Sequence, residues 1–221
     1  FALNDETNQN DQNLQSMREL IPSTMDRLHE LSNKSGGLIG SSTGYKDLDN
    51  KLQGLQNGDL IVVAGRPSMG KTSLAMNVAE NVLLDSESKG SVLIFSLEMP
   101  GESLTTRLLS GMTKLNQQNV RSGMLKDDEL RILFQQSEKL KNLPLWIDDS
   151  SILSPMELRA KARRLARTEK DGLSLIVVDY LQLMQLPLSS ENRVNQISEI
   201  SRSLKSLAKE LNVPVIALSQ L

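Results

Sequence analysis

The stretch Gly65-Arg66-Pro67-Ser68-Met69-Gly70-Lys71-Thr72 fits the pattern G-x-x-x-x-G-K-[ST] and decides which fold we expect for the whole chain. The apolar run at residues 60–64 predicts a buried strand before it, and residues 72–84 carry apolar side chains at helical spacing after it. A glycine-bounded loop between a strand and a helix is the context in which this pattern binds phosphates. The alternative is a chance glycine-rich turn, and the two correct flanks argue against it.

Each residue type in this loop has a role in holding a nucleotide. The glycines let backbone N–H groups turn toward phosphates, and the helix N-terminus adds a partial positive charge. We expect Lys71 to contact the β- and γ-phosphates and the Thr72 hydroxyl to bind Mg²⁺. The sequence therefore predicts a site for ATP and Mg²⁺ built from Gly65, Arg66, Pro67, Ser68, Met69, Gly70, Lys71, Thr72 and Ser73.

The composition narrows the classes of protein to consider. The 221 residues include 25 Lys and Arg against 27 Asp and Glu, so any binding of nucleic acid has to come from a local patch. The chain has no cysteine, which excludes disulfides and thiolate metal sites, and it has no apolar run long enough to span a membrane. We therefore expect a cytoplasmic protein with no membrane association. His29, the only histidine, is expected on a helix surface without a catalytic role.

The first 37 residues predict a disordered segment followed by a short amphipathic helix. Residues 1–15 are rich in Asn, Gln and Asp. Pro22 is expected to break an earlier helix capped by Ser16 and Glu19, so a start at Ser23 with Asp26 is favoured. An isolated helix of about ten residues is not stable in water. Its apolar stripe therefore needs a partner, either its own core or a neighbouring subunit, through Met25, Leu28 and Leu31.

Residues 38–221 predict one α/β domain. Apolar runs at 60–64, 91–97, 144–148, 173–178 and 213–218 alternate with helical patterns, which favours a mainly parallel sheet with helices on both faces. One helix, starting after Ser154-Pro155, carries a basic cluster that we interpret as a solvated face ahead of a nucleic-acid or subunit contact. The cluster consists of Arg159, Lys161, Arg163, Arg164 and Arg167.

Three polar residues follow predicted strands, at the edge where ligands of open parallel sheets bind. Asp179 is a candidate for orienting Mg²⁺, and Glu98 for accepting a proton from the attacking water. Gln220 is a candidate sensor of the γ-phosphate. Each has a plainer alternative: an Asp after a strand often caps a helix, and Glu98 precedes a loop signal.

Several stretches of the sequence together resemble those of a known family, the DnaB-type replicative DNA helicases. The resemblance rests on the phosphate loop, on Phe95-Ser96-Leu97-Glu98-Met99, on Asp148-Asp149-Ser150-Ser151 and on Asp179-Tyr180-Leu181-Gln182-Leu183-Met184. It continues from Ile200 through Ser219-Gln220-Leu221, covers about residues 36–221, and makes residues 16–32 similar to that family's linker helix.

The resemblance implies a RecA-like P-loop NTPase domain that belongs to a ring of six, hydrolyses ATP and moves along single-stranded DNA to unwind the duplex at the replication fork. It implies Lys71, Glu98 and Gln220 as catalytic residues and Thr72 and Asp179 at the metal. Primase and a helicase loader are the implied partners in the primosome. It also implies that the domain is incomplete at its C-terminal end, that the sensor strand lies between the two Walker strands, and that residues 60–64 are left as an exposed edge.

Two alternatives stay open at the level of sequence: a RecA-like recombinase or clock-type ATPase, and a nucleotide-gated assembly module that binds ATP without turning it over. Residues 185–195 lack an apolar period and are expected to form a loop facing the ring channel. Within it, Arg193 is the candidate DNA contact, and the competing interpretation is an arginine that caps the following helix or pairs with Glu191.

Overall fold

The computed structural model describes residues 15–33, 38–85, 88–185 and 193–221. It divides the chain into two units, Phe1–Ile39 and Gly40–Leu221, and each is described here by itself. The segment predicted to be disordered lies almost wholly outside the described residues. Among the described helices, none is both long and apolar enough to cross a membrane.

In the part of the first unit that the structure describes there is one helix, α2 (Met17–Asn33), and the start of α2 corrects the sequence prediction. The helix runs through Pro22 instead of beginning after it. The Ser16 backbone N–H donates to Glu19 Oε2 at 3.0 Å, so the earlier of the two possible capping residues is the one used. Pro22 lacks the backbone N–H of an ordinary helical residue and its ring crowds the carbonyl four residues earlier, so the helix forms in spite of this cost.

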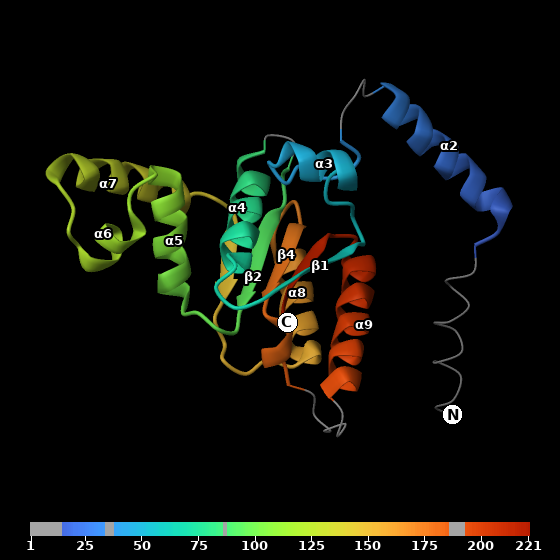
Figure 1. The fold of residues 1–221 in the computed structure, drawn as a ribbon. Helices are drawn as coiled ribbons and strands as arrows, with labels where there is room; N and C mark the ends of the chain where they lie inside the picture. Colours follow the sequence, from blue (N-terminus) through green and yellow to red (C-terminus); the bar gives the residue numbers. More distant parts are fainter. Residues whose placement is uncertain (1–14, 34–37, 86–87, 186–192) are drawn as a thin grey trace. The chain divides into compact units, whose positions relative to one another are not determined.

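The second unit is built on five parallel strands in the order β1-β5-β4-β2-β3 (Figure 1). The strands are β1 (Leu60–Gly65), β2 (Ser91–Ser96), β3 (Leu145–Asp148), β4 (Leu173–Asp179) and β5 (Val215–Gln220). The predicted parallel sheet is confirmed, and β5 lies between β1 and β4 as the resemblance implied. Because all strands run the same way, their carboxyl ends meet at one edge of the sheet.

The helices of this unit are α3 (Lys46–Leu52), α4 (Lys71–Leu84), α5 (Gly101–Thr113), α6 (Gln117–Ser122), α7 (Asp127–Lys141), α8 (Pro155–Thr168), α9 (Arg193–Leu211) and the 3-10 turn η1 (Leu181–Leu183). The sequence missed α6, a single short turn capped by the Asn116 side chain. It also placed residues 193–195 in a loop, whereas they open α9. Residues 186–192 of that predicted loop lie outside the described part of the chain.

Two apolar layers sandwich the sheet because side chains alternate along each strand. Leu93, Phe95, Ile176 and Val178 face α8 and α9, and they pack in a layer with Leu158, Ile200 and Leu204. Val92, Ile94, Leu175 and Val177 face the opposite side, where α4 and α5 supply Ala79, Val82, Leu104 and Leu108. Helices therefore cover both faces, as the uninterrupted apolar runs predicted.

Strand β1 is an edge of the described sheet, because β5 is its only paired neighbour there. Val62, at its middle, is 50% exposed, in contrast to the buried residues of β4 and β5. The exposed edge that the resemblance implied at residues 60–64 is therefore present in the described structure. An open parallel edge is a surface that another strand can pair with.

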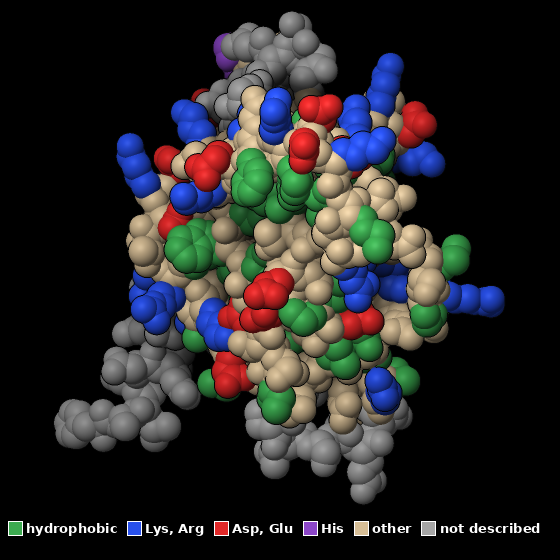
Figure 2. Space-filling model, turned by 90° about the vertical axis from the view of Figure 1, so that its left-hand side faces the viewer, with side chains coloured by type: hydrophobic (Ala, Val, Ile, Leu, Met, Phe, Trp, Pro, Cys, Tyr) green, Lys and Arg blue, Asp and Glu red, His purple; other side chains and the backbone are tan. Residues whose placement is uncertain are grey.

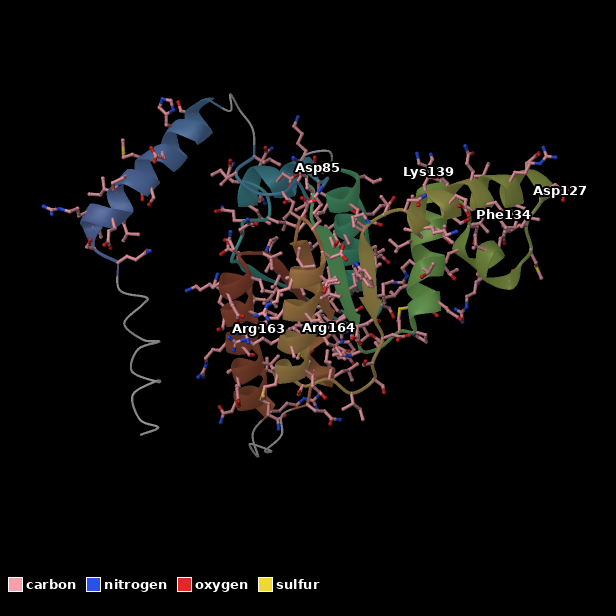
Figure 3. The ribbon with its side chains drawn as sticks, turned by 180° about the vertical axis from the view of Figure 1, so that it is seen from behind. Asp85, Asp127, Phe134, Lys139, Arg163 and Arg164 are labelled. Atoms are coloured by element: carbon pink, nitrogen blue, oxygen red, sulfur yellow. The ribbon has the colours of Figure 1, made fainter. Side chains whose placement is uncertain are left out.

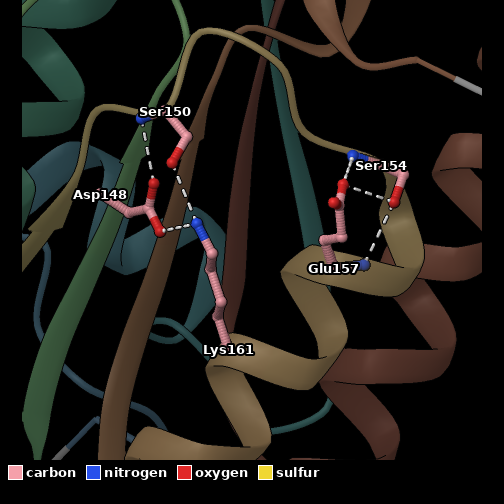
Figure 4. Close-up of polar contacts among 5 residues, drawn as sticks. All are labelled: Asp148, Ser150, Ser154, Glu157 and Lys161. Carbon is pink, nitrogen blue, oxygen red and sulfur yellow. Dashed lines mark hydrogen bonds and ion pairs between the residues drawn. The ribbon is translucent and has the colours of Figure 1, made fainter.

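Most residues of the basic cluster on α8 form ion pairs that hold this helix in position. Arg159 and Arg163 both form ion pairs with Glu210 of α9, and Figure 3 shows Arg163 on the side of α8 that faces α9. Lys161 pairs with Asp148 at the end of β3 and donates to Ser150 at 3.0 Å (Figure 4). The predicted solvated face is therefore only part of the description, because Arg159, Lys161 and Arg163 also form ion pairs within the domain.

The start of α8 and the end of β3 are each closed by a short polar network (Figure 4). Ser154 and Glu157 form a capping box, with the Ser154 N–H donating to Glu157 Oε2 at 2.8 Å. Burial acts to raise the pKa of Asp148, but hydrogen bonds from Lys161 and Ser150 outweigh it, so this pKa lies below its ordinary value. The two networks hold the loop between β3 and α8 in place.

Candidate nucleotide-binding site

The phosphate loop joins β1 directly to α4, with Gly70 as the N-cap of the helix. Gly70 has φ 84°, in the left-handed region, and no atom lies within 4 Å of where a Cβ would stand. The backbone angle, rather than lack of space, is therefore what requires glycine at this position. Lys71 donates through Nζ to the carbonyls of Gly65 at 2.8 Å and Arg66 at 2.9 Å, so its ammonium group lies over the loop.

The site is centred on a hydrogen bond between the first turn of α4 and the end of β4. Thr72 donates through Oγ1 to Asp179 Oδ2 at 2.8 Å. Asp179 is only 4% exposed. Burial raises the pKa of Asp179, the hydrogen bond from Thr72 lowers it, and the nearby carboxylate of Glu98 raises it further, leaving the pKa above its ordinary value. A buried carboxylate of this kind favours a nearby cation.

These two oxygens fit a Mg²⁺ ion that is completed by a nucleotide. Mg²⁺ prefers hard oxygen ligands and is usually held by one or two protein groups together with substrate phosphates and water. The described residues contain no group of three or more His, Cys, Asp and Glu side chains that could hold a metal unaided. The Thr72 hydroxyl and the Asp179 carboxylate are therefore the pair that would hold the ion, with the phosphates supplying further oxygens.

Glu98 stands just beyond β2, on the strand next to the one that ends in Asp179. The Leu97 N–H donates to the Asp179 carbonyl at 2.8 Å, which ties the ends of β2 and β4 together. Asp149 accepts from the Gly101 N–H at 2.9 Å and so fixes the start of α5. Glu98 is exposed between these two fixed points, where its carboxylate is accessible to water.

Gln220 is the last residue of β5, and it is paired in register with Gly65 at the start of the phosphate loop. The strand order places it between the ends of β1 and β4, where the sensor was expected. Gln220 lines the same cleft as Lys71 and Asp179. Arg193, by contrast, opens α9 and does not line this cleft.

The cleft has a volume of about 350 Å³. It brings together the three candidate residues at strand ends and most of the phosphate loop, whereas Gly65, Arg66 and Met69 are not among its lining residues. The lining residues are Pro67, Ser68, Gly70, Lys71, Thr72, Ser73, Glu98, Met99, Arg107, Asp179, Tyr180 and Gln220.

Among the lining residues that were not predicted for the site, Arg107 is the charged one; the others are Met99 and Tyr180. Arg107 projects from α5, where Leu104 and Leu108 are buried at helical spacing, so its position beside the apolar stripe was the available signal. Its Nη1 donates to Ser73 Oγ at 3.5 Å, while its buried Nε has no hydrogen-bond partner among the described residues. A partly buried guanidinium with an unused donor is suited to binding a phosphate oxygen.

The domain has a parallel sheet, a phosphate loop and a buried aspartate on the second strand from β1. These features define a nucleotide-binding domain of the RecA-like P-loop class. Residues 40–221 match the family described as the DnaB-like helicase C-terminal domain. The chain therefore belongs to the DnaB-like helicase family.

Relatives with known names agree with this assignment. Over 223 residues the chain is 47% identical to the replicative DNA helicase DnaB of Buchnera aphidicola subsp. Baizongia pistaciae, and over 225 residues it is 48% identical to that of Pasteurella multocida. Each match covers 100% of the chain and 48% of the relative, so the chain spans about half the length of the curated relatives it matches.

Solved structures give the same result. The ATPase domain of G40P is similar with a TM-score of 0.85 and 30% identity, over 95% of this chain and 72% of that one. A DnaB-like replicative helicase, described together with its interactions with primase, is similar with a TM-score of 0.80 and 30% identity, over 95% of this chain and 49% of that one. The predicted RecA-like fold is confirmed.

Substitution of Lys71 by Ala should lower nucleotide affinity by at least about tenfold, because two unit charges a few ångströms apart in a partly buried site interact by several kcal/mol. The fold should be retained, since the Lys71 ammonium contacts only loop carbonyls. Calorimetric titration with ATP and Mg²⁺ measures the affinity, and Lys170→Ala, on an exposed lysine, is the control. An affinity of Lys71→Ala within twofold of the parent would disprove the phosphate-loop assignment.

Proposed function

We propose that this chain is the motor part of a cytoplasmic replicative DNA helicase, which hydrolyses ATP to move along single-stranded DNA and unwind the duplex at the replication fork. The observation that carries the proposal is the convergence of Lys71, Thr72, Asp179, Glu98 and Gln220 on one cleft, in a chain of the DnaB-like family. The named relatives are replicative DNA helicases, which supports the same assignment.

In this proposal each polar group of the cleft acts on the nucleotide. Lys71 and Arg107 bind phosphate oxygens, and Thr72 and Asp179 hold Mg²⁺, which neutralises charge that develops on the transferred phosphoryl group. Glu98 accepts a proton from the attacking water, consistent with its exposed position beside the buried carboxylate. Gln220 donates a hydrogen bond to the γ-phosphate and so distinguishes ATP from ADP.

Membership of the DnaB-like family argues against the recombinase alternative. The assembly module is the second candidate function for this chain, because ring ATPases complete their sites with an arginine from a neighbour. ATP turnover of the full-length protein, measured with and without single-stranded DNA, separates the two functions. A helicase motor hydrolyses ATP faster on DNA, whereas an assembly module binds ATP with no turnover in either condition.

Glu98→Gln should separate nucleotide binding from hydrolysis, since the amide keeps the shape of the side chain but cannot accept the proton. In the full-length protein we expect ATP affinity to be retained and DNA-stimulated turnover to fall by about two orders of magnitude or more. Glu102→Gln, on the exposed first turn of α5, is a matched control that should keep full turnover. Unchanged turnover in Glu98→Gln would place the catalytic base elsewhere.

Single-stranded DNA is proposed to contact Arg193, which is exposed and opens α9 after the segment that follows the Asp179 strand. Substitution by Ala should weaken binding to all sequences alike and reduce the salt dependence of binding by about one phosphate contact. Fluorescence titration with labelled oligonucleotides at several salt concentrations measures both. Arg202→Ala, an exposed arginine on the same helix, is the control. A lower melting temperature with unchanged DNA affinity would instead assign Arg193 a structural role.

Self-association into a hexameric ring is proposed to use α2. Taken by itself, the helix presents Met17, Ile21, Met25 and Leu28 along one side, and each is more than half exposed. The second unit has exposed apolar side chains on α7 and just before it, within the face that Figure 2 shows. These are Met124, Ile132 and Phe134. Ile132 and Phe134 are two residues apart and so lie on different sides of α7, and we propose that the side carrying Phe134 receives the α2 stripe of another copy. A head-to-tail contact of this kind can close a ring.

Leu28→Asp should therefore abolish self-association, because a charge would have to be buried in the contact. Light scattering after gel filtration, with Mg-ATP present, measures the oligomer. Ser23→Asp places the same charge on the opposite side of α2 and should leave assembly intact. A hexamer that persists in Leu28→Asp would exclude α2 from the contact.

For the whole protein we propose primase and a helicase loader as further partners, and the similar structure described with primase supports the first.

A further inference from the structure

The end of β5 is held by a side chain at a place where the sheet supplies no backbone partner. Strands β4 and β5 pair only from Ile176↔Val215 to Val178↔Ala217. Beyond that point, toward the cleft, β5 continues through Ser219 and Gln220 on the side that β4 has left. The unpaired backbone groups there need another partner or water.

Gln182 provides that partner. Its Nε2 donates to the Gln220 carbonyl at 2.9 Å, and its Oε1 accepts from the Gln220 N–H at 3.2 Å. Nε2 also donates to Ser219 Oγ at 2.9 Å. One side-chain amide therefore binds both backbone groups of Gln220, as a neighbouring strand would.

Gln182 itself is carried on a rigid support. It is the middle residue of η1, where Leu181 is 1% exposed and Met184, just after the turn, is 7% exposed. Both side chains pack in the apolar layer beneath α9. The turn therefore cannot shift without disturbing the core. It holds the amide of Gln182 in a fixed position beside the end of β5.

The other side of Gln220 is tied to the phosphate loop. Gln220 is in register with Gly65, and the Leu221 N–H donates to the Gly65 carbonyl at 3.2 Å. That same carbonyl accepts from Lys71. The backbone of Gln220 is therefore clamped between the loop that holds the phosphates and the turn that follows Asp179.

We propose that Gln182 is a positioning residue for the nucleotide sensor: it fixes the backbone of Gln220 so that the Gln220 side chain meets the γ-phosphate. This inference rests on the proposed sensor role of Gln220. A purely structural bond would stabilise the protein but act equally on ATP and ADP. A positioning role acts only on the γ-phosphate, so it changes the preference between the two nucleotides.

The test measures affinities of the full-length protein for a non-hydrolysable ATP analogue and for ADP, both with Mg²⁺. Gln182→Leu, which keeps the approximate volume and removes both amide groups, should reduce the preference for the ATP analogue by up to about tenfold, the most that one hydrogen bond commonly contributes. ADP affinity should stay within about twofold of the parent.

Two further variants make the result decisive. Gln220→Ala removes the sensor itself, and adding Gln182→Leu to it should cause no further loss of preference, because the two residues act through one contact. Gln56→Leu removes a comparable bond, from Gln56 Nε2 to the Leu52 carbonyl, away from the cleft and should leave the preference unchanged. If Gln220→Ala lowers the preference and folded Gln182→Leu does not, the positioning role is overturned. If Gln220→Ala has no effect, the proposed sensor role itself fails.

Discussion

The hydrogen bond from Thr72 to Asp179 is the contact on which the rest of the site depends. It joins residues that are 107 positions apart, one on the first turn of α4 and one at the end of β4. For them to meet, β1 and β4 must run parallel with only β5 between them, and α4 must start directly at the end of β1. The Thr72 hydroxyl can therefore reach Asp179 only with this order of strands. Asp179 tolerates its burial because this hydroxyl and nearby cationic groups compensate part of the desolvation cost.

Around that contact, cross-links join the ends of neighbouring strands. The Leu97 N–H binds the Asp179 carbonyl, Asp149 caps α5, and Gln182 closes β5 against η1. These contacts lie at the carboxyl edge of the sheet, where the strands no longer pair with one another. Such a cleft can place charged groups close together without collapsing, because their backbones are fixed before a ligand arrives. The ion pairs of α8 belong to the same framework at a greater distance from the nucleotide.

The sequence predicted which residues meet at the cleft where a motif or the end of an apolar run fixes their place. The phosphate loop has a fixed spacing, and Glu98, Asp179 and Gln220 each follow an apolar run, so a parallel sheet brings them to one edge. Arg107 was missed because a charged residue beside a buried helical stripe resembles an ordinary surface arginine until the helix is placed. The start of α2 was predicted wrongly because an interior proline disfavours a helix without forbidding it, and α2 runs through Pro22. The start of α9 was placed too late because Arg193 and Asn195 are polar and exposed, and polarity alone does not separate a helix end from a loop.

The most direct test of the account is whether the Thr72 and Asp179 pair holds Mg²⁺ for the nucleotide. Calorimetric titration with ATP, in Mg²⁺ and in excess EDTA, compares the parent with Asp179→Asn, whose amide oxygen can still accept the Thr72 hydroxyl. Mg²⁺ should strengthen binding by at least about tenfold in the parent, and most of this gain should be lost in the folded variant. An Asp179→Asn variant that keeps the full Mg²⁺-dependent gain of the parent would show that the Thr72 and Asp179 pair does not hold the ion.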